Sequence, residues 1–163
     1  MNPVLFSSAK QDWTTPKWLF AQLDAEFAFE SDAAASPDNA LCPRFFTEDD
    51  DALTQDWRGR FFLNPPYSRM AGHFVRHAWE QVYVHRHADR GAVLIAARAD
   101  TRWWNAYAMR GAEIRFVEGR LHFGESANAA TFPSAVLVFD RFKTHPVAFS
   151  TIKQPRRSHD DSH

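Results

Sequence analysis

The chain has 163 residues, a formal net charge of −1 and 45% hydrophobic residues, which together predict one globular domain with its own core. No stretch approaches the roughly 20 apolar residues of a membrane helix, so we expect no membrane partner. The N-terminus lacks the basic-then-apolar pattern of a secretory signal, and Cys42 has no second cysteine with which to form an internal disulfide. We therefore expect a protein of the reducing cytoplasm.

The charge is unevenly distributed along the chain. Residues 1–57 carry three basic and eleven acidic side chains, whereas residues 58–163 carry sixteen basic and nine acidic ones. An acidic first part suits a cationic or hydroxyl-bearing small ligand, and a basic second part suits phosphates. Solvated surfaces are charged in any protein, so this asymmetry ranks ligand classes without identifying one.

Residues 1–13 are predicted to be a loose arm, and a helix follows them. Thr14 and Thr15 offer a hydroxyl for the N-cap, and Pro16 is the residue type typical of the first helical position. Apolar residues recur at helical spacing from Leu19 onwards, so the helix should end near residue 26. Capping alone would explain the two threonines, which leaves a ligand-binding role for them open.

Residues 27–35 are predicted to form a strand that runs into a loop of small residues, Asp32-Ala33-Ala34-Ala35. Small side chains directly after a strand let a ligand approach the backbone, as glycines do in nucleotide-binding turns. A short strand is expected over 44–47, and the acidic run 48–51 follows it. Such a run is usually a solvated loop, but acids at strand ends also bind ribose hydroxyls.

The centre of the chain is a strand that ends at two prolines. Phe61-Phe62-Leu63 predict a short buried strand, and Asn64 comes directly after it. The residue before a proline is held extended and each proline fixes its own φ, so Asn64 precedes a stiff loop. Such a loop is suited to gripping an exocyclic amino group with an amide oxygen and a backbone carbonyl while Tyr67 stacks on the ring. An ordinary Pro-Pro turn with a packing tyrosine is the alternative.

The remaining elements alternate between helix and strand. We predict a helix over about 71–87, a doubly buried strand over 92–96, a short helix over about 102–109, a strand over 113–117, a polar loop with one short strand-like piece over 120–133, and a last strand over 134–139. Beyond about residue 145 the chain is polar and basic. We therefore predict one domain over 1–145 and a disordered tail over 146–163.

Helices that alternate with short apolar strands, with an antiparallel pair at the end, predict a three-layer α/β domain. In such sheets, ligands bind beyond the carboxyl ends of the strands. Asp32-Ala33, Asn64-Pro65 and Arg98-Asp100 each follow a predicted strand. Three polar loops should therefore line one edge of the sheet, and this convergence favours a ligand site over three unrelated turns.

A series of short motifs runs through residues 13–139: Trp13-Thr14-Thr15-Pro16, Asp32-Ala33-Ala34, Cys42-Pro43-Arg44-Phe45-Phe46-Thr47, Asp56-Trp57, Asn64-Pro65-Pro66-Tyr67, Arg98-Ala99-Asp100-Thr101-Arg102-Trp103, Gly119-Arg120-Leu121-His122-Phe123 and Phe132-Pro133-Ser134. In this order and spacing they make the chain resemble the phage-type (Dam-like) DNA adenine-N6 methyltransferases. This family belongs to the class I S-adenosylmethionine-dependent enzymes. The resemblance covers most of the chain and rests on many motifs, which makes it specific.

The resemblance implies a Rossmann-like, mostly parallel, seven-stranded sheet with an antiparallel C-terminal hairpin. It implies methyl transfer from S-adenosylmethionine to the 6-amino group of a flipped adenine in DNA, with S-adenosylhomocysteine as product and no metal. Position by position, the cofactor contacts would be Thr14, Thr15, Pro16, Asp32, Ala33, Ala34, Asn64 and one acid of 48–51, here assigned to Asp51. The catalytic loop would be Asn64, Pro65, Pro66 and Tyr67. The chain departs from the wider superfamily in lacking the usual glycine-rich turn at 32–35.

A chain of this length has no room for a separate target-recognition domain. The grip on DNA phosphates should therefore come from basic side chains of the domain itself, for which we nominate Arg69, Arg76, Arg98, Arg102 and Arg120, with the tail at 153–157 as a further candidate. The resemblance further implies a phage or prophage gene product in the bacterial cytoplasm, acting in restriction–modification or gene expression. A monomer and a homodimer remain equally open.

Three other functions fit the same residues. An Asn-Pro-Pro-Tyr loop serves equally well to hold the side-chain amide of a protein glutamine, or the amino group of RNA adenine or of cytosine. A non-catalytic nucleic-acid-binding module on the same fold is the last alternative. The arginine-rich second half favours nucleic acid over protein as the substrate.

Overall fold

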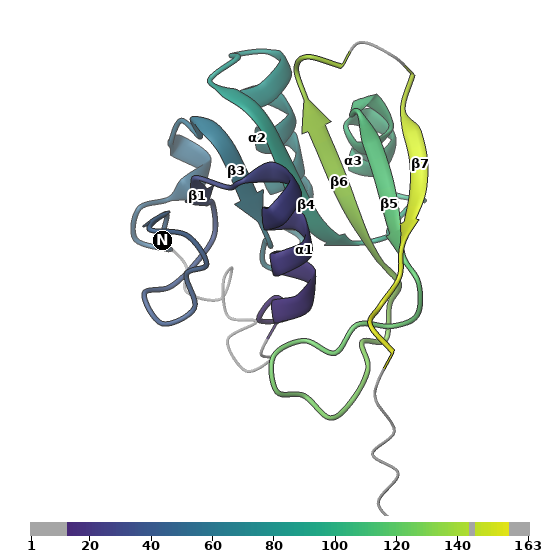
Figure 1. Ribbon diagram of the computed structural model, residues 1–163. Coiled ribbons are helices and arrows are strands. Elements are labelled where there is room, and N and C mark those ends of the chain that lie inside the picture. The colour runs from purple at the N-terminus through teal and green to yellow at the C-terminus, as the bar shows by residue number, and fades with distance from the viewer. Residues whose placement is uncertain (1–12, 144–145, 157–163) are drawn as a thin grey trace, which may run out of the picture.

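The computed structural model describes residues 13–143 and 146–156 and shows a seven-stranded sheet in the order β2-β1-β3-β4-β6-β5-β7 (Figure 1). The strands are β1 (Ser31–Asp32), β2 (Arg44–Phe45), β3 (Gly59–Leu63), β4 (Ala88–Ala96), β5 (Glu113–Val117), β6 (Ser134–Asp140) and β7 (Ala148–Ile152). Strand β6 pairs antiparallel with both β4 and β5, and the other four pairings are parallel. The predicted α/β class, mostly parallel with an antiparallel β5–β6 pair near the C-terminus, is confirmed.

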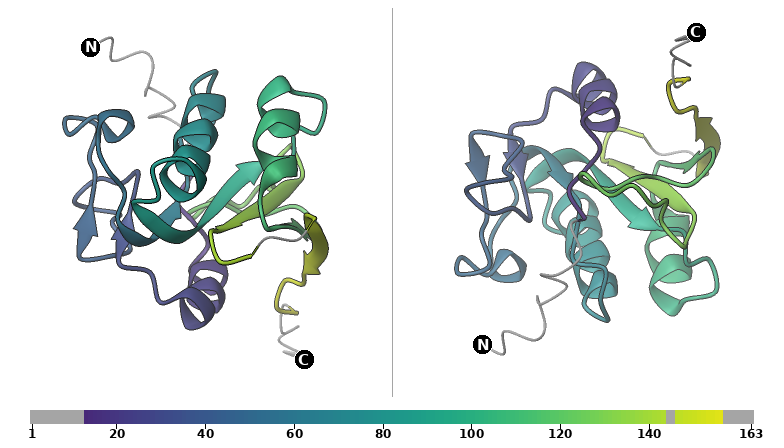
Figure 2. Two further views of the ribbon diagram at one scale, coloured as in Figure 1. Left: turned by 90° about the horizontal axis from the view of Figure 1, so that it is seen from above. Right: turned by 90° about the horizontal axis from the view of Figure 1, so that it is seen from below.

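Helices cover both faces of this sheet. Helix α1 (Lys17–Phe27) lies on one face, and α2 (Ala71–Tyr83) lies with α3 (Arg102–Ala106) on the other (Figure 2). Two short 3₁₀ turns, η2 (Ala52–Thr54) and η3 (Ala108–Arg110), complete the elements described. The chain therefore folds into three layers, as the alternation of elements predicts.

Each face of the sheet has its own hydrophobic core, because successive side chains of a strand point to opposite faces. In β3, Phe61 and Leu63 pack into the core under α2, while Phe62 packs into the core under α1. All three side chains are fully buried. Strand β3 thus lies in the middle of the molecule, and Asn64, which follows it, is fixed at the carboxyl edge of the sheet.

Several element bounds differ from those predicted. Helix α2 ends at Tyr83 and β4 begins at Ala88, so the predicted helix was too long and the predicted strand too short. The region predicted as one short helix splits into α3 and η3, and the strand expected from residue 27 is only Ser31–Asp32. Residues 120–133 are described throughout and contain no strand.

The prediction of a disordered tail over 146–163 was wrong for its first part. Ala148–Ile152 form β7, which pairs in parallel with β5 along its whole length. Only Ile152 is buried, because β7 is an edge strand whose other side chains face solvent. Backbone pairing to β5, rather than an apolar pattern, stabilises it, and the sequence therefore carries little sign of it. Residues 157–163 lie outside the described part of the chain.

Candidate active site

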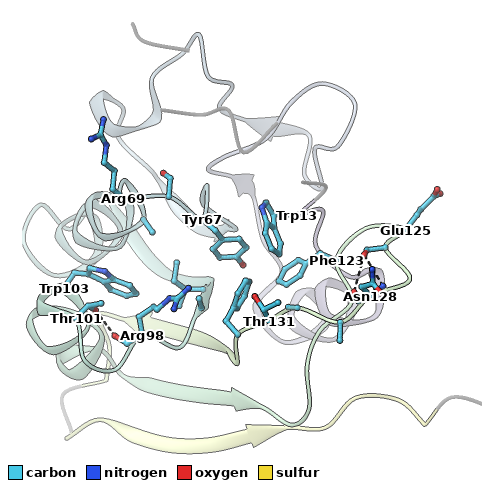
Figure 3. A pocket seen from close by; sticks show the side chains of 18 residues that line it. Trp13, Tyr67, Arg69, Arg98, Thr101, Trp103, Phe123, Glu125, Asn128 and Thr131 are labelled. Atoms are coloured by element: carbon cyan, nitrogen blue, oxygen red, sulfur yellow. Dashed lines mark hydrogen bonds between the residues drawn. The ribbon is translucent and has the colours of Figure 1, made fainter. Parts of the chain in front are cut away.

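Two clefts open at the carboxyl edge of the sheet and meet at Trp13, which lines both. One, here called the acidic cleft, has a volume of about 720 Å³ and is lined by Trp13, Thr14, Thr15, Asp32, Ala34, Ala35, Ser36, Pro37, Asn39, Leu41, Phe46, Thr47, Glu48, Asp49, Ala52, Phe62, Asn64, Pro65, Pro66 and Phe74. The other, here called the aromatic cleft, has a volume of about 990 Å³. Its walls include Trp13, Tyr67, Ser68, Arg69, Ile95, Arg98, Thr101, Trp103, Phe123, Glu125, Asn128, Thr131 and Phe132 (Figure 3).

The Asn64-Pro65-Pro66-Tyr67 loop forms the boundary between the two clefts. Asn64 and the two prolines line the acidic cleft, whereas Tyr67 lines the aromatic cleft. A short turn follows, because the Ser68 N–H donates to the Pro66 carbonyl at 2.9 Å. The loop predicted to be catalytic therefore lines both the acidic cleft and the aromatic cleft.

The Asn64 side-chain amide is held by its nitrogen. Its Nδ2 donates to the Trp13 carbonyl at 2.8 Å and to the Thr15 Oγ1 at 2.9 Å. Its Oδ1 is buried and accepts no hydrogen bond from the described residues. Buried acceptors are usually paired, so an orphaned amide oxygen beside a ligand cleft indicates a partner that comes with the ligand.

Tyr67 presents a neutral ring in a group of aromatic side chains. Its hydroxyl donates to the Leu94 carbonyl at 3.4 Å, and burial raises the pKa of that hydroxyl. The ring centroid lies 5.3 Å from that of Trp13, 5.4 Å from that of Phe132 and 5.6 Å from that of Phe123. These are the spacings at which aromatic rings attract one another, so the aromatic cleft suits a flat heterocycle.

Asp32 is the buried acid of the acidic cleft. It is the last residue of β1 and pairs in register with Phe62 of β3. Only 3% of its surface is exposed. Burial raises the pKa of its carboxyl to about 6, although hydrogen bonds from the Leu41 and Ala34 N–H groups, at 3.1 and 3.4 Å, act in the opposite direction. A desolvated acid of this kind attracts a cationic ligand.

The small residues after Asp32 divide into two groups. Ala34 and Ala35 line the acidic cleft, so a ligand meets only methyl groups and backbone there. Ala33 is fully buried, its N–H donates to the Phe62 carbonyl at 2.8 Å, and it does not line the cleft. Pro16 is likewise absent from the lining and precedes α1 as its N-cap residue. The structure brings Thr14, Thr15, Asp32, Ala34 and Asn64 together and leaves Pro16 and Ala33 behind them.

The acidic run 48–51 contributes two acids to the cleft. Glu48 and Asp49 line it, whereas Asp51 does not. Asp51 has a φ of 50° and precedes η2, and Asp50 accepts hydrogen bonds from the Thr47 N–H and hydroxyl. The placement does not support Asp51 as a cleft residue; Glu48 and Asp49 are the acids of the run that line the cleft.

The predicted DNA-binding arginines separate into two sets. Arg69 and Arg98 line the aromatic cleft, and the Arg98 guanidinium lies 5.8 Å from the centroid of the Phe132 ring. Figure 3 shows Arg98 pointing among the cleft side chains and Arg69 pointing away from them. Arg102 begins α3 between the cleft residues Thr101 and Trp103. Arg102 itself lines neither cleft, and the same is true of Arg120 and of Arg76, which pairs with Glu80 at 2.7 Å.

The sequence interpretation assigned no role to Trp13, Phe123 or Phe132, although their motifs were part of the resemblance. All three rings pack together, with centroids 5.2 Å apart for Trp13 and Phe123 and 5.4 Å for Trp13 and Phe132. They come from the segment before α1 and from the loop between β5 and β6. The available signal was their place in the motifs that carry the resemblance.

Two further observations bear on the class of protein. Within residues 13–143 and 146–156, no three His, Cys, Asp or Glu side chains gather as they would around a metal ion. No helix of the described chain is long and apolar enough to cross a membrane.

The fold and the paired clefts define a Rossmann-like methyltransferase domain. The profile of the family described as DNA N-6-adenine-methyltransferase (Dam) matches residues 4–162, so the chain belongs to this family, as the motifs indicate.

Three relatives are informative. The DNA N-6-adenine-methyltransferase of Escherichia phage T1 is 33% identical over 112 residues, which cover 67% of this chain but only 45% of that protein. The protein of the same name from Haemophilus phage HP1 (strain HP1c1) is 29% identical over 142 residues, which cover 82% of this chain and 80% of that protein. The putative methyltransferase YfdM of Escherichia coli (strain K12) is 36% identical over 63 residues, which cover 34% of this chain and 69% of that protein. The chain thus spans less than half of the phage T1 protein.

Proposed function

We propose that this protein transfers a methyl group from S-adenosylmethionine to the 6-amino group of adenine in DNA. Family membership gives the reaction class, and one observation carries the proposal to particular residues: the buried Asn64 Oδ1 has no described partner, and Asn64 lines the acidic cleft in the same loop whose Tyr67 lines the aromatic cleft. An acceptor in that position is available to an N–H of the target base.

The acidic cleft fits the cofactor by its chemistry. S-adenosylmethionine, when bound, supplies an electrophilic methyl group on a sulfonium, and S-adenosylhomocysteine is left as product. Its positive charge suits the buried Asp32, and its ribose hydroxyls suit Glu48 or Asp49. Thr14 and the small Ala34 complete the contacts that the lining supports. Nothing in this proposal calls for a metal.

Asn64 acts on the amino group of the target base. An aromatic amine is a poor nucleophile because its lone pair is delocalised into the ring. When the Asn64 Oδ1 and the Pro65 carbonyl each accept one N–H, the nitrogen becomes pyramidal and its lone pair becomes available. The amide is neutral, so it stabilises developing positive charge without introducing a buried charge of its own.

The aromatic cleft takes the base itself. Extruding a base from the duplex costs a few kcal/mol. Stacking on Tyr67 returns about 1–3 kcal/mol. Burial keeps the Tyr67 hydroxyl protonated and the Leu94 carbonyl fixes it, so the ring offers a rigid apolar face. In this proposal the substrate is DNA and the site of action is the bacterial cytoplasm.

The deciding experiment is methyl transfer from radiolabelled S-adenosylmethionine to unmethylated duplex DNA, followed by digestion to nucleosides and separation. We expect the label in N6-methyldeoxyadenosine. Label in methyldeoxycytidine would overturn the choice of base. Absence of label in DNA, with tight cofactor binding, would direct the assay to RNA and to protein glutamine, and absence of cofactor binding would favour a non-catalytic module.

The arginines at the aromatic cleft are predicted to anchor DNA phosphates. Replacing Arg69 and Arg98 together with alanine should lower the slope of log Kd against log salt by about 2 and weaken binding roughly tenfold or more at low salt. Arg76→Ala is the matched control, since Arg76 lies outside both clefts and pairs with Glu80, and it should leave the slope unchanged. Fluorescence anisotropy with a labelled duplex between 50 and 200 mM salt is suitable. Wild-type binding that does not weaken with salt would contradict the assignment.

A further inference from the structure

The segment Trp13–Thr15 supplies both hydrogen-bond acceptors of the Asn64 side-chain amide that the described residues provide. The Trp13 carbonyl and the Thr15 Oγ1 accept one hydrogen bond each from Asn64 Nδ2, which uses both amide protons. Thr15 is only 5% exposed, so water does not compete freely for its hydroxyl. Thr15 also does not cap α1, whose N-cap residue is Pro16 and carries no side-chain cap.

This arrangement permits one orientation of the amide. A carbonyl oxygen only accepts hydrogen bonds. Rotating the Asn64 amide by half a turn would set Oδ1 against the Trp13 carbonyl, two acceptors facing each other, and would present Nδ2 to the substrate amino group, two donors facing each other. In the observed orientation Oδ1 is the atom left without a partner. The acceptor that the proposed chemistry needs is thus selected by the groups on the other side of the amide.

The segment itself is firmly held. The Trp13 ring packs against Tyr67 and Phe123, with centroid distances of 5.3 and 5.2 Å. The Thr14 carbonyl accepts a hydrogen bond from the Gly124 N–H at 2.9 Å, which ties the segment to the loop between β5 and β6. Pro16 fixes its own φ and leads directly into α1. The two acceptors are therefore presented by a backbone that is anchored on both sides.

We infer that Thr15 is a positioning residue for Asn64: its hydroxyl and the Trp13 carbonyl lock the amide with Oδ1 towards the target amino group. This inference rests on the proposed function for its catalytic meaning, and it replaces the cofactor-binding role that the sequence interpretation gave to Thr15. The threonine hydroxyl touches Asn64 and acts through it.

The locked amide predicts that an aspartate is unsuitable at this position in this chain. A carboxylate offers an oxygen to the substrate as well as an amide does, but its second oxygen would face the Trp13 carbonyl with no proton between them. We expect Asn64→Asp to lower kcat at least a hundredfold at neutral pH, close to the loss from alanine. Retention of substantial activity would mean that an acceptor alone is sufficient and that the lock has no role.

The direct test uses Thr15→Val, which keeps the shape and removes the acceptor, with Thr15→Ser as the matched variant that keeps the hydroxyl. In wild-type protein without DNA, we expect the Asn64 side-chain amide protons to exchange slowly by ¹⁵N–¹H NMR. Thr15→Val should speed that exchange and lower kcat about tenfold, with the Kd for S-adenosylmethionine changed less than about threefold. Thr15→Ser should behave like the wild type in all three measurements.

Two outcomes would overturn the inference. One is a Thr15→Val protein whose cofactor Kd rises in step with its loss of kcat, which is the signature of a cofactor ligand. The other is unchanged exchange of the Asn64 amide protons. The NMR and calorimetric measurements need no methyl acceptor. A wild-type protein that fails to methylate adenine would therefore refute the proposed function, while altered exchange in Thr15→Val would still establish the lock.

Discussion

Replacing Asn64 with alanine is expected to abolish methyl transfer while leaving the affinity for S-adenosylmethionine nearly intact. The substitution removes a buried acceptor that has no partner among the described residues and that belongs to a residue lining the acidic cleft. Loss of a single preorganised hydrogen-bonding group typically lowers kcat by about 10²–10³. Measurement of kcat with labelled cofactor and of the cofactor Kd by calorimetry separates the two effects.

Asn105→Ala is the matched control for that experiment. Asn105 is an exposed asparagine of α3, outside both clefts, and its Nδ2 also donates to two carbonyl or hydroxyl acceptors, here the Ala99 and Thr101 carbonyls. We expect wild-type kcat from it. Removing Asn64 also leaves the Trp13 carbonyl and Thr15 hydroxyl unpaired, which costs about 1–3 kcal/mol of stability. Both variants should therefore be assayed at a temperature well below that at which they unfold. Equal losses of kcat and cofactor binding in Asn64→Ala would make Asn64 a structural residue.

The position of Asn64 was predictable because its causes are local. A buried apolar strand and two prolines act over eight residues of sequence, and both place Asn64 extended at a strand end. The structure confirms that strand as β3 and brings Asn64 to the edge that the α/β pattern indicates. The family resemblance predicted further residues near Asn64: Thr14, Thr15, Asp32 and Ala34 all line the acidic cleft.

What could not be predicted depends on contacts between distant parts of the chain. The hydrogen bond between Asn64 and the Trp13 carbonyl joins residues 51 positions apart, so the sequence around Thr15 shows only a helix start. Strand β7 was missed for the same reason, since its partner β5 lies far away in sequence and its own side chains are mostly exposed. Loop geometry decided the rest: Asp51 has a φ of 50° and precedes η2, and Glu48 and Asp49, not Asp51, line the cleft.

Binding of S-adenosylmethionine is expected to release a proton near pH 6 and to weaken as the pH falls through that value. Burial raises the pKa of the free Asp32 carboxyl to about 6, and a bound cation favours the carboxylate and lowers that pKa again. Near and below pH 6, binding must therefore expel the proton. Calorimetry at pH 5.5, 6 and 7.5, in buffers of different ionisation enthalpy, counts the released protons directly.

The same carboxyl group makes the free protein less stable as the pH rises. The folded protein holds the Asp32 proton more tightly than the unfolded chain, whose carboxyl has its ordinary pKa of 3.8. The free energy of unfolding should therefore fall between about pH 4 and pH 6, by an amount on the order of 3 kcal/mol from this group alone. Above pH 6 the group contributes no further change. Cofactor should offset part of this loss, since it stabilises the charged form.

Asp32→Asn tests both effects at once. The neutral side chain should raise the cofactor Kd about ten- to a hundredfold at pH 7.5 and remove the proton release, because no carboxylate is left to attract the sulfonium. Asp38→Asn is the matched control, an exposed acid of the same loop that does not line the cleft, and it should leave both quantities unchanged. If Asp32→Asn bound the cofactor as tightly as wild type at every pH, the buried acid would be a structural group that holds the Leu41 and Ala34 N–H groups, and the positive charge of the cofactor would have to be met by Glu48 or Asp49.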